Sequence, residues 1–568
     1  MTVAEAACAV LPAAAPSKAD QKRKLPLLPV AALLKQQQTL TAVERFAKLH
    51  ESPDAPLHEK YYRDLIPLER PKPGEQYAFE VDLDLCTGCK ACVAGCHAQN
   101  GLDEDEIWRT VGLLHGGSAN APAQQTVTTS CHHCLEPACM HGCPTKAYEK
   151  DPITGIVRHL DDQCFGCQYC TLMCPYDAPK YSKSRGIVRK CDMCSGRLAH
   201  GEAPACVEAC PNGAIAIKVV ERAEVVEASN ARQFLPGAPS PDHTLPSTRY
   251  KSNKVMPANM LPADFYVTRP EHSHPPLVVM LTLTQLSVGA FGLTLAAERL
   301  SPATLGSPLA QTVFACAIAV LALGASVFHL GRPLLAWRAV LGLRTSWLSR
   351  EALVFGLFAQ LAVLYGALTA MPLLPPFPFD SLLAGFAPSI RAAAALAGVL
   401  GVFCSVMVYV VTRREQWSAA QTVVKFFGTT LLLGAASVLV VTAFTGSSAG
   451  FGSLAVKALI FTILAATFVK LAVEGRTLLM ARDLRQTALK RMAVVMLGEL
   501  RAATVVRFAL AIAGGLLLPG LWAYGSVRPA DPRLFTVTVL LLLAGSEFLE
   551  RYLFFRAAPA SHMPGGLK

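Results

Sequence analysis

The pattern of apolar and polar positions divides the chain into two unlike halves. From Leu277 to Phe555, long apolar runs alternate with short polar breaks. Eight of these runs reach the length of about 20 residues that a helix needs to cross a bilayer. They lie near residues 277–297, 309–330, 351–372, 390–412, 426–446, 452–473, 502–524 and 534–555. The pattern predicts an all-α bundle of eight transmembrane helices over residues 277–556, with both ends on the same side.

The first half shows shorter patterns. Residues 76–224 contain brief strand-like segments, such as Tyr77–Asp82 and the Gly155-Ile-Val-Arg stretch after an Asp-Pro turn, which predict an α+β domain. Residues 225–276 contain nine prolines and predict a linker or an extended arm lying on a surface. Residues 1–75 predict an N-terminal extension with a short helix between Leu40 and Ser52, and residues 557–568 a C-terminal tail.

Composition narrows the class of protein. The sequence has 568 residues, of which 52% are hydrophobic and only 16% charged, against about 25% charged in an average soluble domain. A wholly soluble protein and a disordered one are therefore both excluded. The net charge of +11 does not indicate a nucleic-acid partner, because the basic residues concentrate in loops between apolar runs, as in membrane proteins.

The cysteines carry the candidate chemistry. Sixteen of the nineteen fall between Cys86 and Cys210, in four groups. The groups are Cys86, Cys89, Cys92 and Cys96; Cys131, Cys134, Cys139 and Cys143; Cys164, Cys167, Cys170 and Cys174; and Cys191, Cys194, Cys206 and Cys210. The first and third have the C-x2-C-x2-C-x3-C spacing of bacterial ferredoxins, and the other two each lengthen one gap. Proline follows the last cysteine of every group except the first, where His97 stands.

This spacing predicts four [4Fe–4S] clusters. In a ferredoxin, one loop supplies three thiolates to a cluster, and the fourth cysteine of the group ligates the other cluster of a pair. Four complete groups therefore form two interleaved pairs. Disulfides and zinc sites fit poorly, because neither requires four repeats of a cysteine triplet followed by a fourth cysteine. Basic residues near the groups predict a positive environment: Lys90, Lys146, Lys180, Arg185, Arg189, Lys190 and Arg197.

Groups of this spacing, in this order, resemble the four-cluster iron–sulfur subunit of the DMSO reductase family of molybdoenzymes. The resemblance implies a double-ferredoxin-like domain in which the first and fourth groups share two clusters, and the second and third share the other two. The implied ligand sets are Cys86, Cys89, Cys92 and Cys210; Cys191, Cys194, Cys206 and Cys96; Cys131, Cys134, Cys139 and Cys174; and Cys164, Cys167, Cys170 and Cys143. The last set is expected nearest the membrane.

The apolar half resembles the membrane anchor subunit of the same family. His329, in a His-Leu-Gly-Arg-Pro string, matches the histidine that lies at the quinol site of these anchors. Glu351 and the Ala-Gly-x-Glu string that ends at Glu547 also match. The resemblance covers residues 80–560 and implies a fusion of two subunits that are normally separate.

Quinone chemistry needs proton donors or acceptors beside an apolar slot and an electron source. The predicted quinone-binding residues are His329, Arg332, Glu351 and Tyr409. For Trp337 and Trp417 we favour anchoring at the membrane interface. Lys457 and Arg507 lie near the ends of their segments and are expected to extend their charges towards the interface.

The histidine count argues against haem. A b-type haem between helices needs two facing histidines, and only His329 and His562 follow residue 277. The sequence also shows no molybdopterin site and no catalytic residues, so we expect a separate molybdopterin-containing catalytic subunit. The protein would pass electrons between that subunit and the quinone pool, in contact with membrane lipid.

The distribution of basic residues predicts the orientation. The loops 331–350, 413–425 and 474–501 and the C-terminal tail share the side of the cysteine-rich domain and carry fifteen basic residues, against at most four on the opposite side. Basic loops stay in the cytoplasm, and the N-terminus shows no export signal. The cysteine-rich domain should therefore face the cytoplasm from a bacterial inner (plasma) membrane. The predicted orientation fits the cytoplasm-facing members of the family that resemble membrane-bound sulfite dehydrogenases, and it therefore favours sulfite oxidation.

Three alternatives remain open. The complex could instead reduce DMSO, a polysulfide or another acceptor with electrons from quinol. The membrane half could be a redox-driven transporter, although few charged residues are expected deep in its helices. The protein could also be a metal-binding scaffold without electron transfer.

Overall fold

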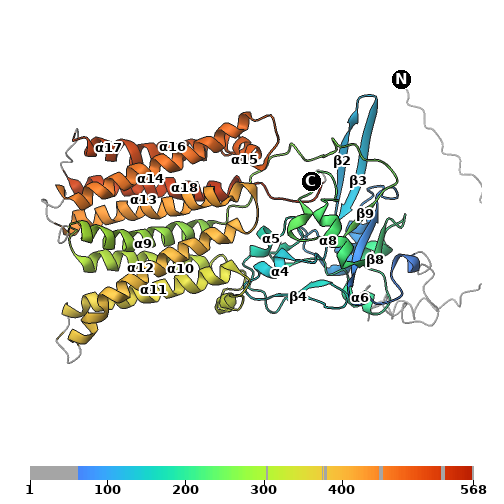
Figure 1. Cartoon of the computed structure of the whole chain (residues 1–568), viewed down its shortest axis with the longest axis horizontal. Coiled ribbons are helices and arrows are strands. Elements are labelled where there is room, and N and C mark those ends of the chain that lie inside the picture. The colour runs from blue at the N-terminus through green and yellow to red at the C-terminus, as the bar shows by residue number, and fades with distance from the viewer. Residues whose placement is uncertain are drawn as a thin grey trace, which may run out of the picture. The chain divides into compact units, whose positions relative to one another are not determined.

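The fold is described from a computed structural model, which describes residues 62–301, 305–373, 375, 380–446, 452–525 and 531–565. The first 61 residues of the predicted extension, including the helix expected between Leu40 and Ser52, lie outside the described residues. From Tyr62 onwards the protein forms a domain of short strands and helices followed by a bundle of long helices (Figure 1). The predicted fold class is confirmed in both halves.

The first domain is built on two three-stranded sheets and two small hairpins. β1 (Glu75–Asp82) contains the predicted strand at Tyr77–Asp82, and it pairs antiparallel with β8 (Ile215–Glu221) and parallel with β9 (Arg249–Lys251). The other strands are β2 (Thr110–Ser118), β3 (Ala121–Thr129) and β10 (Leu261–Pro262) in the second sheet, then β4 (Tyr148–Lys150) with β5 (Val157–His159), and β6 (Lys180–Ser182) with β7 (Ile187–Arg189). The strands frame the loops that carry the cysteines.

The proline-rich segment 225–276 lies along this domain as an extended arm. It begins within α8 (Arg222–Asn230) and adds one strand to each sheet, β9 beside β1 and β10 beside β2. Prolines suit such an arm because they favour extended backbone and do not donate to a ladder. The segment therefore covers sheet edges on its way to the helical half.

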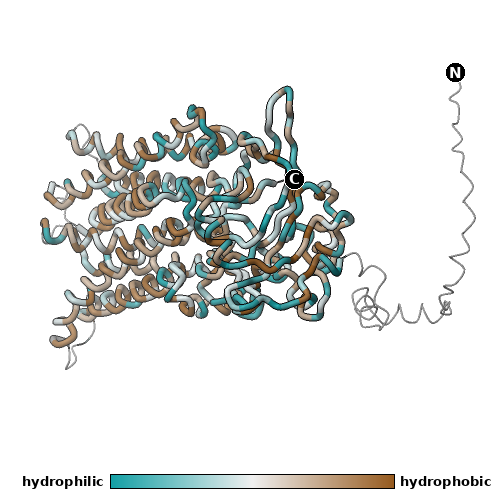
Figure 2. Tube along the Cα trace, turned by 45° about the vertical axis from the view of Figure 1, so that its right-hand side comes forward, coloured by the Kyte–Doolittle hydropathy of each residue, from teal (hydrophilic) through white to brown (hydrophobic). Residues whose placement is uncertain are grey.

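The helical half contains eight candidate membrane spans among the described residues, as predicted. The helices are α9 (Pro275–Leu300), α10 (Pro308–Val327), α11 (Trp347–Ala370), α12 (Asp380–Val410), α13 (Ala419–Thr445), α14 (Leu454–Leu479), α16 (Arg501–Ala511), α17 (Leu518–Ala523) and α18 (Pro532–Arg556). The ends differ by a few residues from the predicted segments, in part because polar caps such as Ser453 and Asp531 accept hydrogen bonds from the first turn. Apolar residues dominate the bundle (Figure 2).

The seventh span is interrupted. α16 and α17 are joined by a π-helix, Ile512–Leu517, and a short helix α15 (Ala488–Leu497) precedes α16. Gly514 and Gly515 lie in the π-helix against α18 and α14, where a β-carbon on Gly515 would meet Thr467 Oγ1 at 2.3 Å. A π-helix of this kind frequently accompanies a functional site.

One end of the bundle contacts the first domain, and we call this end the near side. Ser346 Oγ donates to Gly142 O at 2.7 Å, Arg332 N to Phe165 O at 3.0 Å, and Arg414 Nη2 to Thr171 O at 3.4 Å. The C-terminal tail also returns to the first domain, where Met563 is buried in its core. The loops predicted to share the side of the cysteine-rich domain thus lie together.

Candidate iron–sulfur and quinone sites

The cysteine loops repeat one local backbone path. In Cys-Thr-Gly-Cys-Lys and Cys-Phe-Gly-Cys-Gln, the glycine and the residue after the second cysteine all have positive φ: Gly88, Lys90, Gly166 and Gln168. These left-handed residues turn the backbone back on itself. Lys90 and Gln168 then begin the short helices α3 (Ala91–Asn100) and α5 (Tyr169–Met173), which carry the next cysteine. In the first group, this path places Cys86, Cys89 and Cys92 around one cavity.

The residues after the last cysteine of a group form a second repeated turn. Lys146, Asp177 and Gly213, each three residues after that cysteine, have positive φ. In two of these turns the amide of the next residue approaches the sulfur: Ala147 N lies 3.2 Å from Cys143 Sγ, and Ala214 N lies 3.3 Å from Cys210 Sγ. Amide donors of this kind stabilise a thiolate and raise the potential of a cluster bound to it.

The first group departs from this pattern. His97 replaces proline, so α3 continues past Cys96 to Asn100 instead of turning. The Asn100 side chain takes the place of the missing amide, with its Nδ2 3.6 Å from Cys96 Sγ. A donor therefore still lies beside the sulfur of Cys96, although the sequence of this group departs from the pattern.

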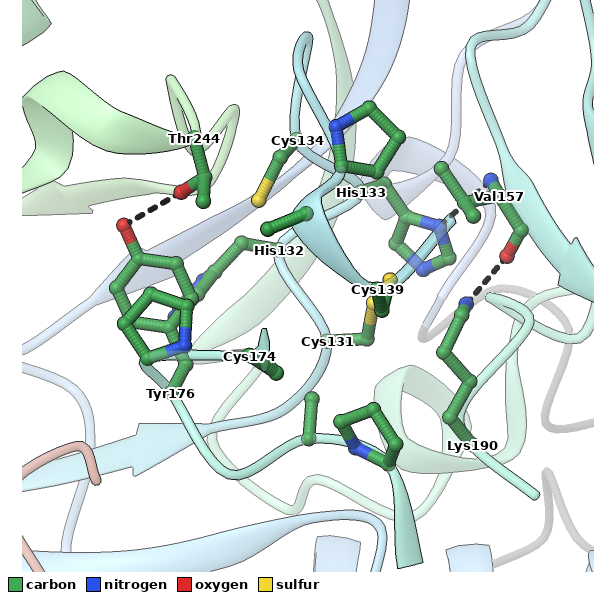
Figure 3. Close-up of a pocket in the computed structure, with 15 residues that line it drawn as sticks. Cys131, His132, His133, Cys134, Cys139, Val157, Cys174, Tyr176, Lys190 and Thr244 are labelled. Carbon is green, nitrogen blue, oxygen red and sulfur yellow. Dashed lines mark hydrogen bonds between the residues drawn. The ribbon is translucent and has the colours of Figure 1, made fainter. Parts of the chain in front are cut away.

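Three cavities in the domain are each lined by one predicted ligand set. One is lined by Cys131, Cys134, Cys139 and Cys174 (Figure 3); a second by Cys96, Cys191, Cys194 and Cys206; a third by Cys86, Cys89, Cys92 and Cys210. Each combines cysteines from two groups, in the interleaved arrangement expected of a ferredoxin pair.

The remaining set lies closest to the helices. Cys143, Cys164 and Cys170 share one buried apolar cluster, and Cys167 interacts electrostatically with Cys143 and Cys164. The carbonyl oxygen of Cys167 contacts His329 of the helical half. This set is therefore placed at the junction between the two halves.

The thiols are suited to hold iron rather than to form disulfides. All sixteen are free cysteines. Burial raises the pKa of Cys96 to about 12 and the pKa values of Cys174 and Cys194 to about 11, so these thiols carry protons until metal displaces them. Four thiols that line one cavity, with amides directed at sulfur in two of the turns, fit a cubane cluster.

Two buried cations lie beside the cavities. Arg109 is 1% exposed, lines the cavity of Cys96 and Cys191, and donates to Thr128 Oγ1 at 3.3 Å. Lys190 lines the cavity in Figure 3, where it contacts Val157 O, and its Nζ donates to Cys191 O at 2.9 Å. Lys190 was among the basic residues predicted near the clusters, whereas Arg109 lies far in sequence from every group and was missed.

The predicted quinone residues lie at the near side, beside the junction. His329 Nε2 lies 3.1 Å from Cys167 O, and Arg332 Nη1 donates to Asp161 O at 2.9 Å. Because a carbonyl oxygen only accepts, Nε2 must be the protonated nitrogen of the neutral His329 ring, which leaves Nδ1 as an acceptor. Burial lowers the pKa of His329, and the hydrogen bond to Cys167 partly opposes this effect.

Glu351 and Tyr409 lie near the same junction, where both interact electrostatically with Tyr169 of the first domain. Glu351 is 3% exposed and accepts from Ser405, and Tyr409 is 4% exposed. Burial raises the pKa of Tyr169 well above its usual value, and nearby Tyr409, Glu351 and Cys167 raise it further. Tyr169 OH donates to Val408 O at 2.7 Å. Tyr169 therefore links the cysteine loop to the two polar residues of the helical half.

Two histidines missed by the sequence reasoning stand next to His329. The ring centroid of His274 lies 5.2 Å from that of His329 and 4.7 Å from that of His272. Burial lowers the pKa of His274 to about 3, with the neighbouring His329 and His272 adding to the effect, so His274 is neutral at neutral pH. Both residues lie in the string His-Ser-His-Pro-Pro, directly before the first apolar run. This string was a usable signal, but only the histidines after residue 277 were considered as ligands.

Three expectations for the helical half are wrong. Trp417 is 2% exposed and stacks on Phe554, so its ring is buried in the protein and does not face lipid as an interfacial anchor would. Arg507 is 1% exposed and pairs with Glu474 inside the bundle, because α16 packs it against α14 and α18. Charged residues are also frequent inside the bundle, and Lys425, counted among the loop residues, is one of them. Lys457 is exposed, and the extension of its charge towards the interface stays a prediction.

Comparison with known proteins gives separate matches for the two halves. Residues 123–220 match the family model described as a 4Fe–4S dicluster domain. Residues 271–556, half of the sequence, match the family model of the DMSO reductase anchor subunit, DmsC.

The curated relatives match the first half. The protein is 35% identical to the B subunit of anaerobic dimethyl sulfoxide reductase from Haemophilus influenzae over 189 residues, which cover 32% of this protein and 91% of that one. It is 40% identical to the corresponding subunit of Escherichia coli strain K12 over 144 residues, covering 24% and 70%. It is 34% identical to the hydrogenase-2 operon protein HybA of Escherichia coli O157:H7 over 183 residues, covering 28% and 56%.

Proposed function

Because the protein belongs to the DMSO reductase anchor subunit family and carries an iron–sulfur dicluster domain on the same polypeptide, we propose that it links a molybdopterin-containing catalytic subunit to the quinone pool. It is a multi-pass membrane protein with an electron-transfer domain, and it fuses two subunits. In this proposal the reaction on the substrate takes place in the partner, and this protein has no catalytic residue for it.

The contact between His329 and Cys167 is the observation that carries the proposal. It joins the cysteine set nearest the helices to the histidine predicted at the quinone site, at 3.1 Å. Tyr169 adds a second link, because it follows Cys167 closely and donates to Val408 in α12. A quinone bound beside His329 would lie next to the last electron carrier.

The proposed cofactors are four [4Fe–4S] clusters, one for each cysteine set. Clusters bound there would supply one-electron transfer over the length of the domain. The protein contributes the thiolates, the amides directed at sulfur, and the buried cations Arg109 and Lys190. Iron and acid-labile sulfide should each amount to about sixteen per polypeptide after anaerobic purification; about eight of each would contradict the assignment.

The proposed quinone-binding residues are His329, Arg332, Glu351 and Tyr409. The acceptor nitrogen of His329 suits a quinol hydroxyl, and Glu351 provides a second group that exchanges protons. Arg332 fixes the loop through Asp161 and Phe165. We propose no haem, because His272, His274 and His329 lie outside the long helices, with the His274 ring in contact with the other two, whereas a b-type haem between helices needs two histidines on facing helices.

We further propose that the iron–sulfur domain faces the cytoplasm from a bacterial inner membrane. The near-side loops carry most of the basic residues between helices, which supports this orientation. A reporter fused after Lys568 tests it. Fluorescence from a cytoplasmic reporter is expected, whereas activity of alkaline phosphatase at that position would contradict the orientation.

Two kinds of substrate are candidates for the catalytic partner. A cytoplasmic site favours sulfite oxidation, with electrons flowing to quinone. The names of the dimethyl sulfoxide reductase relatives favour reduction of dimethyl sulfoxide, or a related acceptor such as polysulfide, with electrons from quinol. Turnover of the purified complex with sulfite and a quinone, compared with dimethyl sulfoxide and a quinol, separates the two.

A further inference from the structure

The connection between α10 and α11 is a short amphipathic element at the near side of the bundle. It contains the 3-10 helix η5 (Pro333–Val340), between the end of α10 at Val327 and the start of α11 at Trp347. At about 2 Å per residue, η5 is about half as long as the hydrocarbon core is thick. We call residues 328–350, from the end of α10 to the first turn of α11, the near-side segment.

One row of side chains on η5 is apolar and uncovered. A 3-10 helix has three residues per turn, so side chains three positions apart lie on one face. Leu334, Trp337 and Val340 form such a row, which we call the outer row; Leu334 is 92% and Trp337 63% exposed, and Val340 is exposed as well. Phe328 and Leu341, just outside the helix, are also exposed. An apolar surface of this kind is unfavourable in water, so we expect another apolar phase to cover it.

A second row of the same helix holds the iron–sulfur domain. Arg332, at the N-cap of η5, and Arg338 lie six residues apart, which is two turns of a 3-10 helix. Arg332 Nη1 donates to Asp161 O at 2.9 Å, and Arg338 Nη1 donates to Asp162 O at 2.6 Å. Both carbonyl groups closely precede Cys164. This inner row therefore holds the loop that begins the cysteine set nearest the helices.

The contact between the near-side segment and the iron–sulfur domain is close. A β-carbon on Gly331 would lie 2.0 Å from Gly186 O, and one on Gly342 would lie 2.8 Å from Cys143 O. A larger residue at either position would force the two backbones apart. The iron–sulfur domain therefore covers the inner side of the segment, and the outer row is left for another phase.

The lipid-facing surface of the bundle continues into the outer row. Over their most apolar stretches, only 28% of α10 and 22% of α11 are buried in the protein, compared with 78% of α13. The exposed side chains of Leu321 on α10 and Leu353 on α11 belong to this surface. Because η5 joins the near ends of these two helices, the bilayer is the apolar phase next to the outer row.

Two tryptophan–arginine pairs indicate the depth of the segment. The guanidinium carbon of Arg338 lies 5.4 Å from the ring centroid of Trp337, and that of Arg350 lies 4.4 Å from the ring centroid of Trp347. Tryptophan rings prefer the boundary between hydrocarbon and headgroups, and arginine keeps its charge among the headgroups. The segment is therefore suited to lie in the interface, with its outer row in the acyl chains.

The near-side segment carries positive charge without an acidic residue of its own. Its charged residues are Arg332, Arg338, Arg344 and Arg350. The hydrogen bonds of Arg332, Arg338 and Arg350 in the described structure go to backbone carbonyl oxygens, which carry no net charge, and Arg344 is exposed. Positive charge beside an apolar row in the interface attracts anionic phosphate groups.

We propose that the near-side segment binds anionic phospholipid, with the acyl chains on the outer row and the phosphate beside Arg344 and Arg350. This extends the interfacial position predicted for Trp337 to a lipid site. The lipid holds η5 from outside while the inner row holds the loop of Cys164, so the lipid positions the cysteine set nearest the bilayer. The proposal requires a bilayer, but it rests on neither quinone nor a catalytic partner.

The first measurement locates Trp337. The full-length protein with oxidised clusters is labelled with fluorotryptophan and placed in nanodiscs of phosphatidylcholine and phosphatidylglycerol. The loss of one of five fluorine NMR signals in Trp337→Phe identifies its resonance. A nitroxide near the headgroup end of a lipid acyl chain should broaden this signal. The signal of Trp417, whose ring is buried in the protein, is identified in the same way and is the control that the nitroxide should leave sharp.

A Trp337 signal that a gadolinium chelate in the water broadens, and that the lipid nitroxide does not, would overturn the proposal. The outer row would then face water in this protein and would be left for a protein partner to cover.

The second measurement compares labelled phosphatidylglycerol with labelled phosphatidylcholine at the same mole fraction. Broadening of the Trp337 signal should be stronger with phosphatidylglycerol, because two arginines near a membrane surface favour an anionic lipid on the order of tenfold. Arg344→Gln/Arg350→Gln should remove this preference. Arg249→Gln, at an exposed arginine of the iron–sulfur domain that pairs with Glu224, is the matched control and should keep it.

The conservative variant Arg344→Lys/Arg350→Lys keeps both charges and should keep the preference, and an unchanged chemical shift of Trp417 shows that each variant is folded. Equal broadening by the two labelled lipids in the wild type, or an undiminished preference in Arg344→Gln/Arg350→Gln, would overturn the proposal. Neither measurement uses quinol, so a failure here is distinct from a failure of the proposed function.

Discussion

The two halves of the molecule place their chemistry in different ways. In the iron–sulfur domain, each set of thiols is organised by short loops, as where Gly88, Lys90, Gly166 and Gln168 turn the backbone within a few residues. In the helical half, the polar groups come from helices far apart in sequence, as in the pair formed by Arg507 and Glu474. Local spacing thus encodes the first kind of site, and only packing between helices assembles the second.

The largest effect that would sharpen this comparison is the loss of one cluster by a single change. Cys167→Ser should lower the iron content from about sixteen to about twelve atoms per polypeptide, because one ligand set is broken while the other three stay intact. Iron analysis and EPR of the dithionite-reduced protein measure this. Cys316→Ser, which changes a cysteine of α10 outside the four sets, should leave the iron content unchanged; a loss of iron there would show that the sets are wrongly assigned.

In the helical half, a single change should act on stability instead. Lys470→Met removes the lysine partner of the buried Glu547 and leaves Arg507, 3.3 Å away, as its ionic partner; removing one partner of a buried pair costs about 3–5 kcal/mol. Thermal unfolding in detergent should show a clear fall in midpoint. The exposed Lys457→Met should stay within about 0.5 kcal/mol of the wild type. Equal stability of the two variants would mean that the Lys470 pair is not formed.

A smaller effect is expected at Arg109, which is buried beside the cysteine cavities. Arg109→Gln removes a positive charge and should lower the midpoint potentials of the neighbouring clusters on the order of tens of millivolts. Redox titration followed by EPR measures the shift. Arg158→Gln, at an exposed ion pair with Glu149, is the control, and a shift of the same size there would remove the special role of Arg109.

The smallest effect concerns the contact between the halves. Tyr169→Phe removes the hydrogen bond to Val408 O and should lower the free energy of unfolding by about 1 kcal/mol. The clusters should assemble normally. A change of several kcal/mol would indicate that Tyr169 supports more than this single bond.

The sequence was informative wherever the relevant pattern is local. Eight spans followed from apolar length, and the four ligand sets were proposed from spacing and from the resemblance to known iron–sulfur subunits. The helix ends were less well predicted, because caps such as Ser453 and the interrupted seventh span are short features. Arg109, His274 and the contact of Lys470 with Glu547 were missed, because their partners lie on other elements, although Glu547 itself was singled out. Charges within apolar segments, such as Lys470 on α14 and Glu550 on α18, were nevertheless visible.

The central claim is that electrons pass between the cluster domain and a quinone beside His329. The most direct measurement compares the reduction of the clusters by a quinol analogue in the wild type and in His329→Ala. Quinol should reduce the wild-type clusters but not those of the variant, while dithionite reduces both to the same extent. Equal rates of reduction by quinol in the two proteins would contradict the assignment of the quinone site to His329.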